Sequence, residues 1–185
     1  MLTLDQLSRV AIVRTSCSGK STLARSLANA LNAPHIELDA LHWGPNWTPC
    51  PIEQLRDDVD KATAKLRWVC HGNYSMVRDL VWSRATSIVW QNYSFSLVFT
   101  RALRRTFSRC FHQTTIYAGN RESFSKSFLS RDSILLWVCN SHWRLKREHS
   151  QVLEDPQYKE VNLIELNSAS AADQFLAAVR RLALK

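Results

Sequence analysis

Apolar residues alternate along the chain between short, strand-like runs and longer stretches with helical spacing. The short runs occupy residues 9–13, 35–39, 67–72, 86–93 and 161–166 and are typical of buried strands. Between them, apolar residues recur every three or four positions, as in Leu23, Leu27 and Leu31, which predicts helices that bury one face. Further helices are predicted from Ile52 to Leu66, over 95–111, over 131–149 and over the last fifteen residues or so. This alternation predicts an α/β fold with a five-stranded parallel sheet covered on both faces.

Two segments interrupt the pattern. Residues 42–51 contain three of the five prolines and are predicted to form a loop, and residues 112–130 are polar and are predicted to be a mobile segment. The chain of 185 residues has the length of one domain, which we take to span residues 1–185.

The stretch "VRTSCSGKST", residues 13–22, lies between the first predicted strand and the first predicted helix. Gly19, Lys20 and Ser21 fit the end of the phosphate-binding pattern Gly-x-x-x-x-Gly-Lys-Ser/Thr, whereas Arg14 stands where the first glycine is expected. Backbone N–H groups at the start of such a helix cradle phosphates, the lysine reaches the β- and γ-phosphates, and the serine hydroxyl ligates Mg²⁺. We therefore expect a nucleotide and Mg²⁺ to bind here, with Ser21 as a metal ligand and with a nucleotide site formed by Thr15, Ser16, Cys17, Ser18, Gly19, Lys20, Ser21 and Thr22. A serine-rich turn with a solvated Lys20 is the alternative.

Longer stretches resemble a known family. The segments "SGKSTLARSLA", "HIELDALHWGPNWTP", "GNYSMVRD", "NRESF" and "SRDSILLW" make the chain, from about residue 9 to 182, similar to the small P-loop kinases related to adenylate kinase. The resemblance is strongest to the adenylate kinase-like or DNA topology modulation protein branch. It implies a three-layer α/β/α nucleotide kinase fold, a mobile lid at about 112–130, and phosphoryl transfer from ATP to a small acceptor.

The sequence departs from this family at four positions, and little is lost at Cys17, which replaces a glycine at a free position of the strict motif. A glycine at the position of Arg14 allows a tight turn, and the arginine either crowds the phosphates or adds a cation to them. His71 and Asn92 stand where the family has acidic residues, and histidine is a poor ligand for Mg²⁺. We expect nucleotide binding to tolerate these changes better than catalysis, which depends on a well-placed metal.

The acceptor is expected on the other side of the same sheet edge. Asp39 ends the second predicted strand and is assigned to catalysis and acceptor binding, with a capping role as the alternative. Trp43, Trp47 and Tyr74 either line a pocket for the acceptor or pack the proline-rich loop on the core. Arg78 either clamps an acceptor phosphate or is a solvated helix residue.

Arginines cluster around the predicted lid. Closing lids deliver cations to the transferred phosphoryl group, so one or two of Arg101, Arg104, Arg105, Arg121 and Arg131 are expected to act. Arg121 and Arg131 are assigned to catalysis, together with Lys20 and Asp39, because of their place in the lid motifs.

The charge balance leaves two other functions open. A net charge of +8 favours an anionic partner, and the departures at Arg14, His71 and Asn92 are also consistent with a nucleotide-binding protein that has lost phosphotransfer. The basic helices at 101–109 and 142–149, with seven tryptophans in the chain, would suit a nucleic-acid-binding module, although no motif of that class is visible.

Cellular location is inferred from what the sequence lacks. Five cysteines without a CxxC pair suit free thiols, and neither a signal peptide nor a membrane-spanning run is recognisable, so we expect a cytoplasmic protein with no membrane partner. Nothing in the sequence predicts the oligomeric state.

Overall fold

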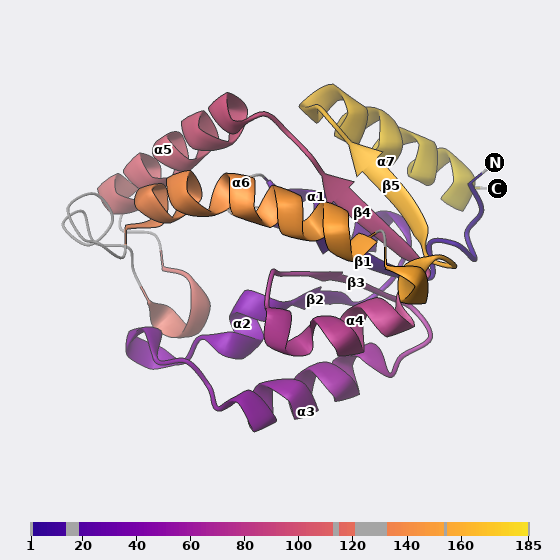
Figure 1. Ribbon diagram of the computed structural model, residues 1–185, viewed down its shortest axis with the longest axis horizontal. Helices are drawn as coiled ribbons and strands as arrows, with labels where there is room; N and C mark the ends of the chain where they lie inside the picture. Colours follow the sequence, from indigo (N-terminus) through magenta and orange to yellow (C-terminus); the bar gives the residue numbers. More distant parts are fainter. Residues whose placement is uncertain (1, 14–18, 113–114, 121–132, 154, 185) are drawn as a thin grey trace.

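The computed structural model describes residues 2–13, 19–112, 115–120, 133–153 and 155–184, and a five-stranded sheet lies at its centre (Figure 1). Every neighbouring pair of strands is parallel, and the order is β2-β3-β1-β4-β5. The strands are Arg9–Val13 (β1), His35–Glu37 (β2), Trp68–His71 (β3), Ser87–Gln91 (β4) and Asn162–Leu166 (β5). The predicted five-stranded parallel sheet is confirmed, and each predicted strand ends within two residues of the observed one.

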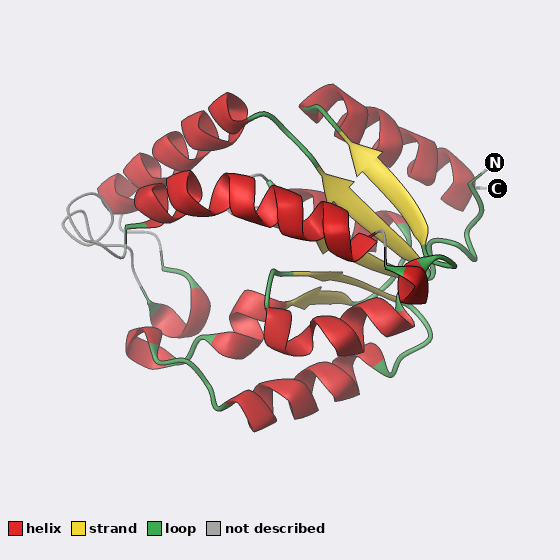
Figure 2. Cartoon of the chain, viewed as in Figure 1, coloured by secondary structure: helices red, strands yellow, loops and turns green. Residues whose placement is uncertain are grey.

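Helices follow the strands along the chain and cover the sheet (Figure 2). They are Lys20–Ala30 (α1), Leu38–His42 (α2), Ile52–Thr63 (α3), Arg78–Arg84 (α4), Phe95–His112 (α5), Ile134–Leu153 (α6) and Ala169–Ala183 (α7). Short 3₁₀ turns occupy Pro45–Trp47 (η1), Ser75–Val77 (η2), Tyr117–Gly119 (η3) and Pro156–Tyr158 (η5). The expectation that the helix beginning at Ile52 reaches Leu66 is wrong, because α3 ends at Thr63 and Leu66 is 86% exposed.

The central strand β1 shows why both faces of the sheet are covered. Val10 and Ile12 pack with α1 and α7, whereas Ala11 and Val13 pack with α3 and α4, and all four side chains are buried. Alternation of this kind places successive side chains on opposite faces, so a strand that is apolar at every position needs helices on both sides.

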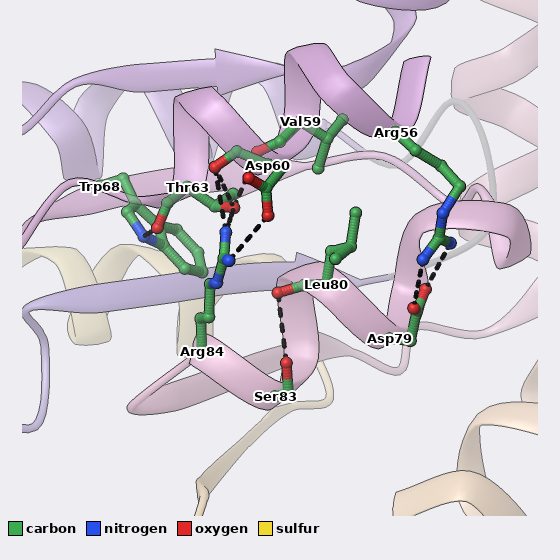
Figure 3. Close-up of polar contacts among 9 residues, drawn as sticks. All are labelled: Arg56, Val59, Asp60, Thr63, Trp68, Asp79, Leu80, Ser83 and Arg84. Carbon is green, nitrogen blue, oxygen red and sulfur yellow. Dashed lines mark hydrogen bonds and ion pairs between the residues drawn. The ribbon is translucent and has the colours of Figure 1, made fainter. Parts of the chain in front are cut away.

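Ion pairs join α3 to α4 on the outside of one face (Figure 3). Arg84 donates to the Asp60 carboxylate at 2.7 Å and to Thr63 Oγ1 at 2.9 Å, and Arg56 pairs with Asp79 at 2.7 Å. Beneath them, the fully buried Trp68 donates its indole N–H to the Thr63 carbonyl at 3.1 Å. These contacts fix the helix layer that packs behind β3.

The carboxyl ends of β1, β2, β3 and β4 meet at one edge of the sheet, where α/β proteins bind ligands. Close packing shapes this edge, because a Cβ atom at Gly72 would lie 2.5 Å from Cβ of Leu38. Gly72 also has a φ of +146°, a backbone conformation that favours glycine. Within the described residues, no helix has the length and apolarity needed to cross a bilayer.

Candidate functional site

The first candidate element is the start of α1 at the carboxyl edge. Gly19 precedes the helix with a φ of +90°, and Lys20 is the first helical residue. Lys20 and Ser21 are half-buried, whereas Thr22 is exposed. Arg14, Thr15, Ser16, Cys17 and Ser18 lie outside the described residues. The described part therefore presents backbone N–H groups of a helix start, an ammonium group and a hydroxyl at one place, which is the arrangement that binds anions.

Glu37, which the sequence reasoning did not single out, lies beside this helix start. It is the last residue of β2, and its Oε1 accepts a hydrogen bond from Ser21 Oγ at 3.3 Å. The same oxygen accepts a hydrogen bond from Tyr117 Oη at 2.6 Å. Glu37 could have been found from its place at the carboxyl end of a predicted strand, two residues before the chosen Asp39.

His71 packs against Glu37 from the neighbouring strand β3. It is 1% exposed, and burial, with smaller effects from Lys20 and His35, lowers its pKa well below the ordinary value. The imidazole is therefore neutral at pH 7, and the 3.6 Å distance from Nε2 to Glu37 Oε1 is not an ion pair. Within the described residues, neither ring nitrogen has a hydrogen-bond partner, and the His35 ring stacks on this one at 5.0 Å.

Asn92 occupies the other position where an acid was expected. Its side-chain amide donates to Glu165 Oε1 at 2.6 Å, and its backbone N–H donates to the Leu166 carbonyl. The side chain therefore ties the end of β4 to the edge strand β5.

Asp39 is held by a tyrosine from another strand–helix connection. Tyr74 Oη donates to Asp39 Oδ1 at 2.6 Å, and burial together with this carboxylate raises the pKa of Tyr74 far above its usual value. The prediction that Asp39 ends the second strand is wrong: the strand ends at Glu37, and Asp39 lies in the first turn of α2. The strand ends two residues earlier than predicted, and the next residue, Leu38, packs closely against Gly72.

A cluster of aromatic rings lies beside this carboxylate. His42 is buried and lies 4.6 Å from both Trp43 and Tyr74, centroid to centroid, and Trp43 lies 5.7 Å from Trp47 in an edge-to-face arrangement. Burial lowers the pKa of His42, so this ring is neutral as well. Asp39 thus stands at the border of an aromatic cluster made from α2, η1 and the turn after β3.

Residues 115–120, from the region predicted as a lid, pack on the proline-rich loop. The buried Asn120 accepts a hydrogen bond from the Trp47 N–H at 3.0 Å and donates to the Gly44 carbonyl at 2.9 Å. These bonds hold the η3 turn where Tyr117 reaches Glu37. The rest of the predicted lid, at 113–114 and 121–130, lies outside the described residues, as does Arg121.

Arg78 is engaged within the fold. Its guanidinium donates to Glu148 Oε1 of α6 at 2.7 Å and lies 5.3 Å from the centre of the Trp82 ring. It also lines a cavity of about 20 Å³ behind the turn after β3, together with Gly72, Tyr74 and Trp82. A space of this size holds about one water molecule, so it is not a pocket for an acceptor.

Arg101 is the lid-side arginine that the structure brings to the helix start. Its Nη1 lies 3.5 Å from the place of a Cβ on Gly19, and its guanidinium lies 5.5 Å from the centre of the buried Tyr93 ring. Arg104, one turn away on α5, is exposed. Arg131, like Arg121, falls outside the described residues.

The fold can be compared with those of solved proteins. The parallel sheet with helices on both sides matches the fold of P-loop kinases. One similar solved structure is a shikimate kinase from Acinetobacter baumannii, with 18% sequence identity, a TM-score of 0.53, and an alignment that covers 98% of this chain and 95% of that one. A shikimate kinase from Bacteroides thetaiotaomicron has 15% identity and a TM-score of 0.52, with 96% of this chain and 98% of that one covered. A gluconokinase from Sinorhizobium meliloti 1021 has 21% identity and a TM-score of 0.50, with 96% of this chain and 94% of that one covered. The sequence matches no protein-family model and no curated protein.

Proposed function

We propose that this protein is an ATP-dependent kinase that transfers a phosphoryl group to a small acceptor. The observation that carries the proposal is the contact between Ser21 and Glu37, two oxygen ligands 3.3 Å apart beside Lys20 at the start of α1. The P-loop kinase fold and the resemblance to the adenylate kinase-like or topology modulation branch support the same activity.

The nucleotide side of the proposal uses the start of α1. We assign the ATP phosphates to the loop of residues 15–22, with Lys20 neutralising charge on the β- and γ-phosphates. Ser21 and Glu37 fit a hard divalent cation because both offer oxygen, and Glu37 supplies the negative charge that the neutral His71 does not. When bound, Mg²⁺ would neutralise the charge that develops on the phosphates.

The acceptor side uses Asp39. In the proposed reaction an acceptor hydroxyl oxygen bonds to the γ-phosphorus, the bond from that phosphorus to the ADP oxygen breaks, and Asp39 takes the hydroxyl proton. Tyr74 positions the carboxylate by binding Oδ1, which leaves Oδ2 for the acceptor. Trp43 is proposed to face the acceptor, whereas Arg78 would first have to leave Glu148.

Three arginines remain candidates for the transferred phosphoryl group. Arg121 and Arg131 keep that role as a proposal from their place in the lid motifs. Arg101 joins them because its guanidinium lies against Gly19. All three would supply positive charge where the transition state carries negative charge.

Binding without turnover is a second candidate function. It is favoured by the neutral His71 and by Asn92, whose side chain is committed to Glu165, because these two positions hold no acid beside the helix start. This candidate predicts ATP binding that is indifferent to Mg²⁺.

Calorimetric titration with ATP, in Mg²⁺ and in EDTA, tests the proposal. We expect binding that requires Mg²⁺, and we expect Glu37→Gln to weaken binding about tenfold or more in Mg²⁺ while changing it little in EDTA. Lys20→Ala should weaken binding in both buffers, and the exposed Glu160→Gln is the matched control. ADP release would then be screened against nucleoside monophosphates, sugars and hydroxy acids. Binding in both buffers alike without ADP release selects the second candidate, and no binding in either overturns both.

A further inference from the structure

The outward sides of α5 and α6 carry large apolar side chains in contact with solvent. The two helices pack against each other and meet at the left of Figure 1, at the side of the molecule opposite the chain termini. Phe107 is 59% exposed, Phe111 75% and Trp143 59%. We call these side chains and their charged neighbours the α5–α6 surface, which comprises Leu103, Arg104, Phe107, Phe111, Leu136, Trp143, Arg144, Lys146 and Arg147.

The same helices hold most of the excess positive charge. Together they contain seven lysine or arginine residues and one acidic residue, Glu148, which is already paired with Arg78. The exposed cations Arg104, Arg144, Lys146 and Arg147 form no ion pair or hydrogen bond with the described part of the chain. By contrast, Arg56 and Arg84 of the α3–α4 layer each pair with an aspartate at 2.7 Å (Figure 3). Four exposed cations with no ion pair to a described residue therefore lie on the two helices that also carry the exposed aromatic rings.

The apolar and basic residues are interleaved on each helix. Phe107 and Phe111 are four residues apart, with rings parallel within 7°, and Arg104 precedes Phe107 by three residues, so all three share a face. Trp143 and Arg147 are four residues apart on α6 and also share a face. A ring is thus placed beside a cation on both helices.

This arrangement selects among anionic partners. A second copy presenting the same surface would bring like charges together, which opposes association. A lipid surface favours an apolar face kept separate from the basic one, whereas here they are mixed. Single-stranded nucleic acid uses both groups at once, because cations bind the phosphates and aromatic rings stack on unpaired bases. A flexible strand can also follow side chains on two helices.

We propose that the α5–α6 surface binds single-stranded nucleic acid. Arg104, Arg144 and Arg147 contact phosphates, and Phe107 and Trp143 stack on bases. This inference does not depend on the proposed kinase activity, since the surface uses none of the residues at the start of α1.

Fluorescence anisotropy with a labelled oligothymidylate of about 20 nucleotides tests the proposal. With about three phosphates contacted, affinity should fall about 20-fold between about 50 and about 200 mM NaCl. Arg104→Gln with Arg147→Gln should reduce the slope of log affinity against log salt by about 1.4. Phe107→Ala and Trp143→Ala should each weaken binding about fivefold or more without changing the slope.

The controls use residues elsewhere on the chain. Arg180→Gln with Arg181→Gln removes the same charge from α7, where both residues are exposed, and should leave the slope unchanged. Lys20→Ala should leave oligonucleotide binding intact. Thermal unfolding confirms that each variant folds.

Four outcomes overturn the proposal. The first is that the oligonucleotide does not bind at about 50 mM NaCl, and the second is that the α7 control lowers the slope as much as the Arg104 and Arg147 pair does. The third is that Lys20→Ala abolishes binding, which would place the strand in the nucleotide site. The fourth is that the protein binds vesicles of phosphatidylcholine and phosphatidylglycerol but not the oligonucleotide, which would make the surface a lipid-binding one.

Discussion

The contact between Gly72 and Leu38 predicts a specific stability defect. In Gly72→Ala the new Cβ would lie 2.5 Å from Leu38 Cβ and 2.9 Å from its Cγ and Cδ1, all closer than ordinary van der Waals contact. Overpacking of this kind costs about 1–3 kcal/mol. The φ of +146° adds about 1–2 kcal/mol for a residue with a side chain. We therefore expect the free energy of unfolding to fall by about 2–5 kcal/mol.

Thermal unfolding followed by circular dichroism measures this change. For a chain of this length, 1 kcal/mol shifts Tm by about 2–4 °C, so Gly72→Ala should lower Tm by about 4–20 °C. Gly119→Ala is the matched control, since Gly119 has a φ of +81° but no atom of a described residue outside its chain neighbours within 4 Å of the added Cβ. In Gly119→Ala the free energy of unfolding should fall only by the about 1–2 kcal/mol that comes from the positive φ. An equal loss in the two variants would refute the argument from close packing. Because Leu38 lies between Glu37 and Asp39, Gly72→Ala should also weaken the Mg²⁺-dependent binding of ATP.

Three further predictions concern protonation, thiol reactivity and an ion pair. The pKa of His71 is lower in the folded protein than the ordinary 6.5, so the unfolded chain binds more protons just below about pH 6.5 and stability falls as the pH drops through that value. The urea concentration at the unfolding midpoint should therefore be lower at about pH 5.5 than at about pH 7.5, and this difference should be smaller in His71→Asn. An identical difference in the variant would mean that another group titrates. Burial raises the pKa of the Cys70 thiol to about 12, so iodoacetamide should label the exposed Cys139 in the native protein and Cys70 only after unfolding. Peptide mass mapping measures which cysteine is labelled, and labelling of Cys70 in the native protein would contradict its buried position. Arg84→Ala removes hydrogen bonds to Asp60 and Thr63 at a partly exposed site, so the free energy of unfolding measured in urea should fall by about 1 kcal/mol. The same change at the exposed Arg67 should leave the free energy of unfolding nearly unchanged. Equal effects of the two changes would mean that this ion pair does not stabilise the fold.

The sheet could be predicted because its signal is local. In β1 every residue from Val10 to Val13 is buried, so the run of apolar residues at 9–13 is visible in the sequence without any knowledge of its neighbours. The same holds for α1, whose Leu23 and Leu27 are spaced by one helical turn and are both buried.

The site was predicted less completely because its contacts join distant segments. Tyr117 and Glu37 are 80 residues apart, and Tyr74 and Asp39 are 35 apart. Periodicity carries no information about such pairs. The close packing of Leu38 against Gly72, in the turn after the neighbouring strand β3, is likewise a contact between distant segments. Glu37 could have been selected from the sequence as a residue at the end of a predicted strand. Its bonds to the Ser21 and Tyr117 hydroxyl groups, however, are visible only in the folded structure.

The docked turn at 115–120 has an energetic consequence for whatever ligand uses Glu37. To move this turn away, the chain must break the bond from Tyr117 to Glu37 and the two bonds that Asn120 makes with Trp47 and Gly44. At about 1 kcal/mol net for each bond, the undocked form is populated to less than about 1% in the free protein. A ligand that binds Glu37 only when Tyr117 does not would then have an apparent affinity about 100-fold lower than its intrinsic affinity for the undocked form. Tyr117→Phe removes one of the three bonds and should recover part of that difference in affinity.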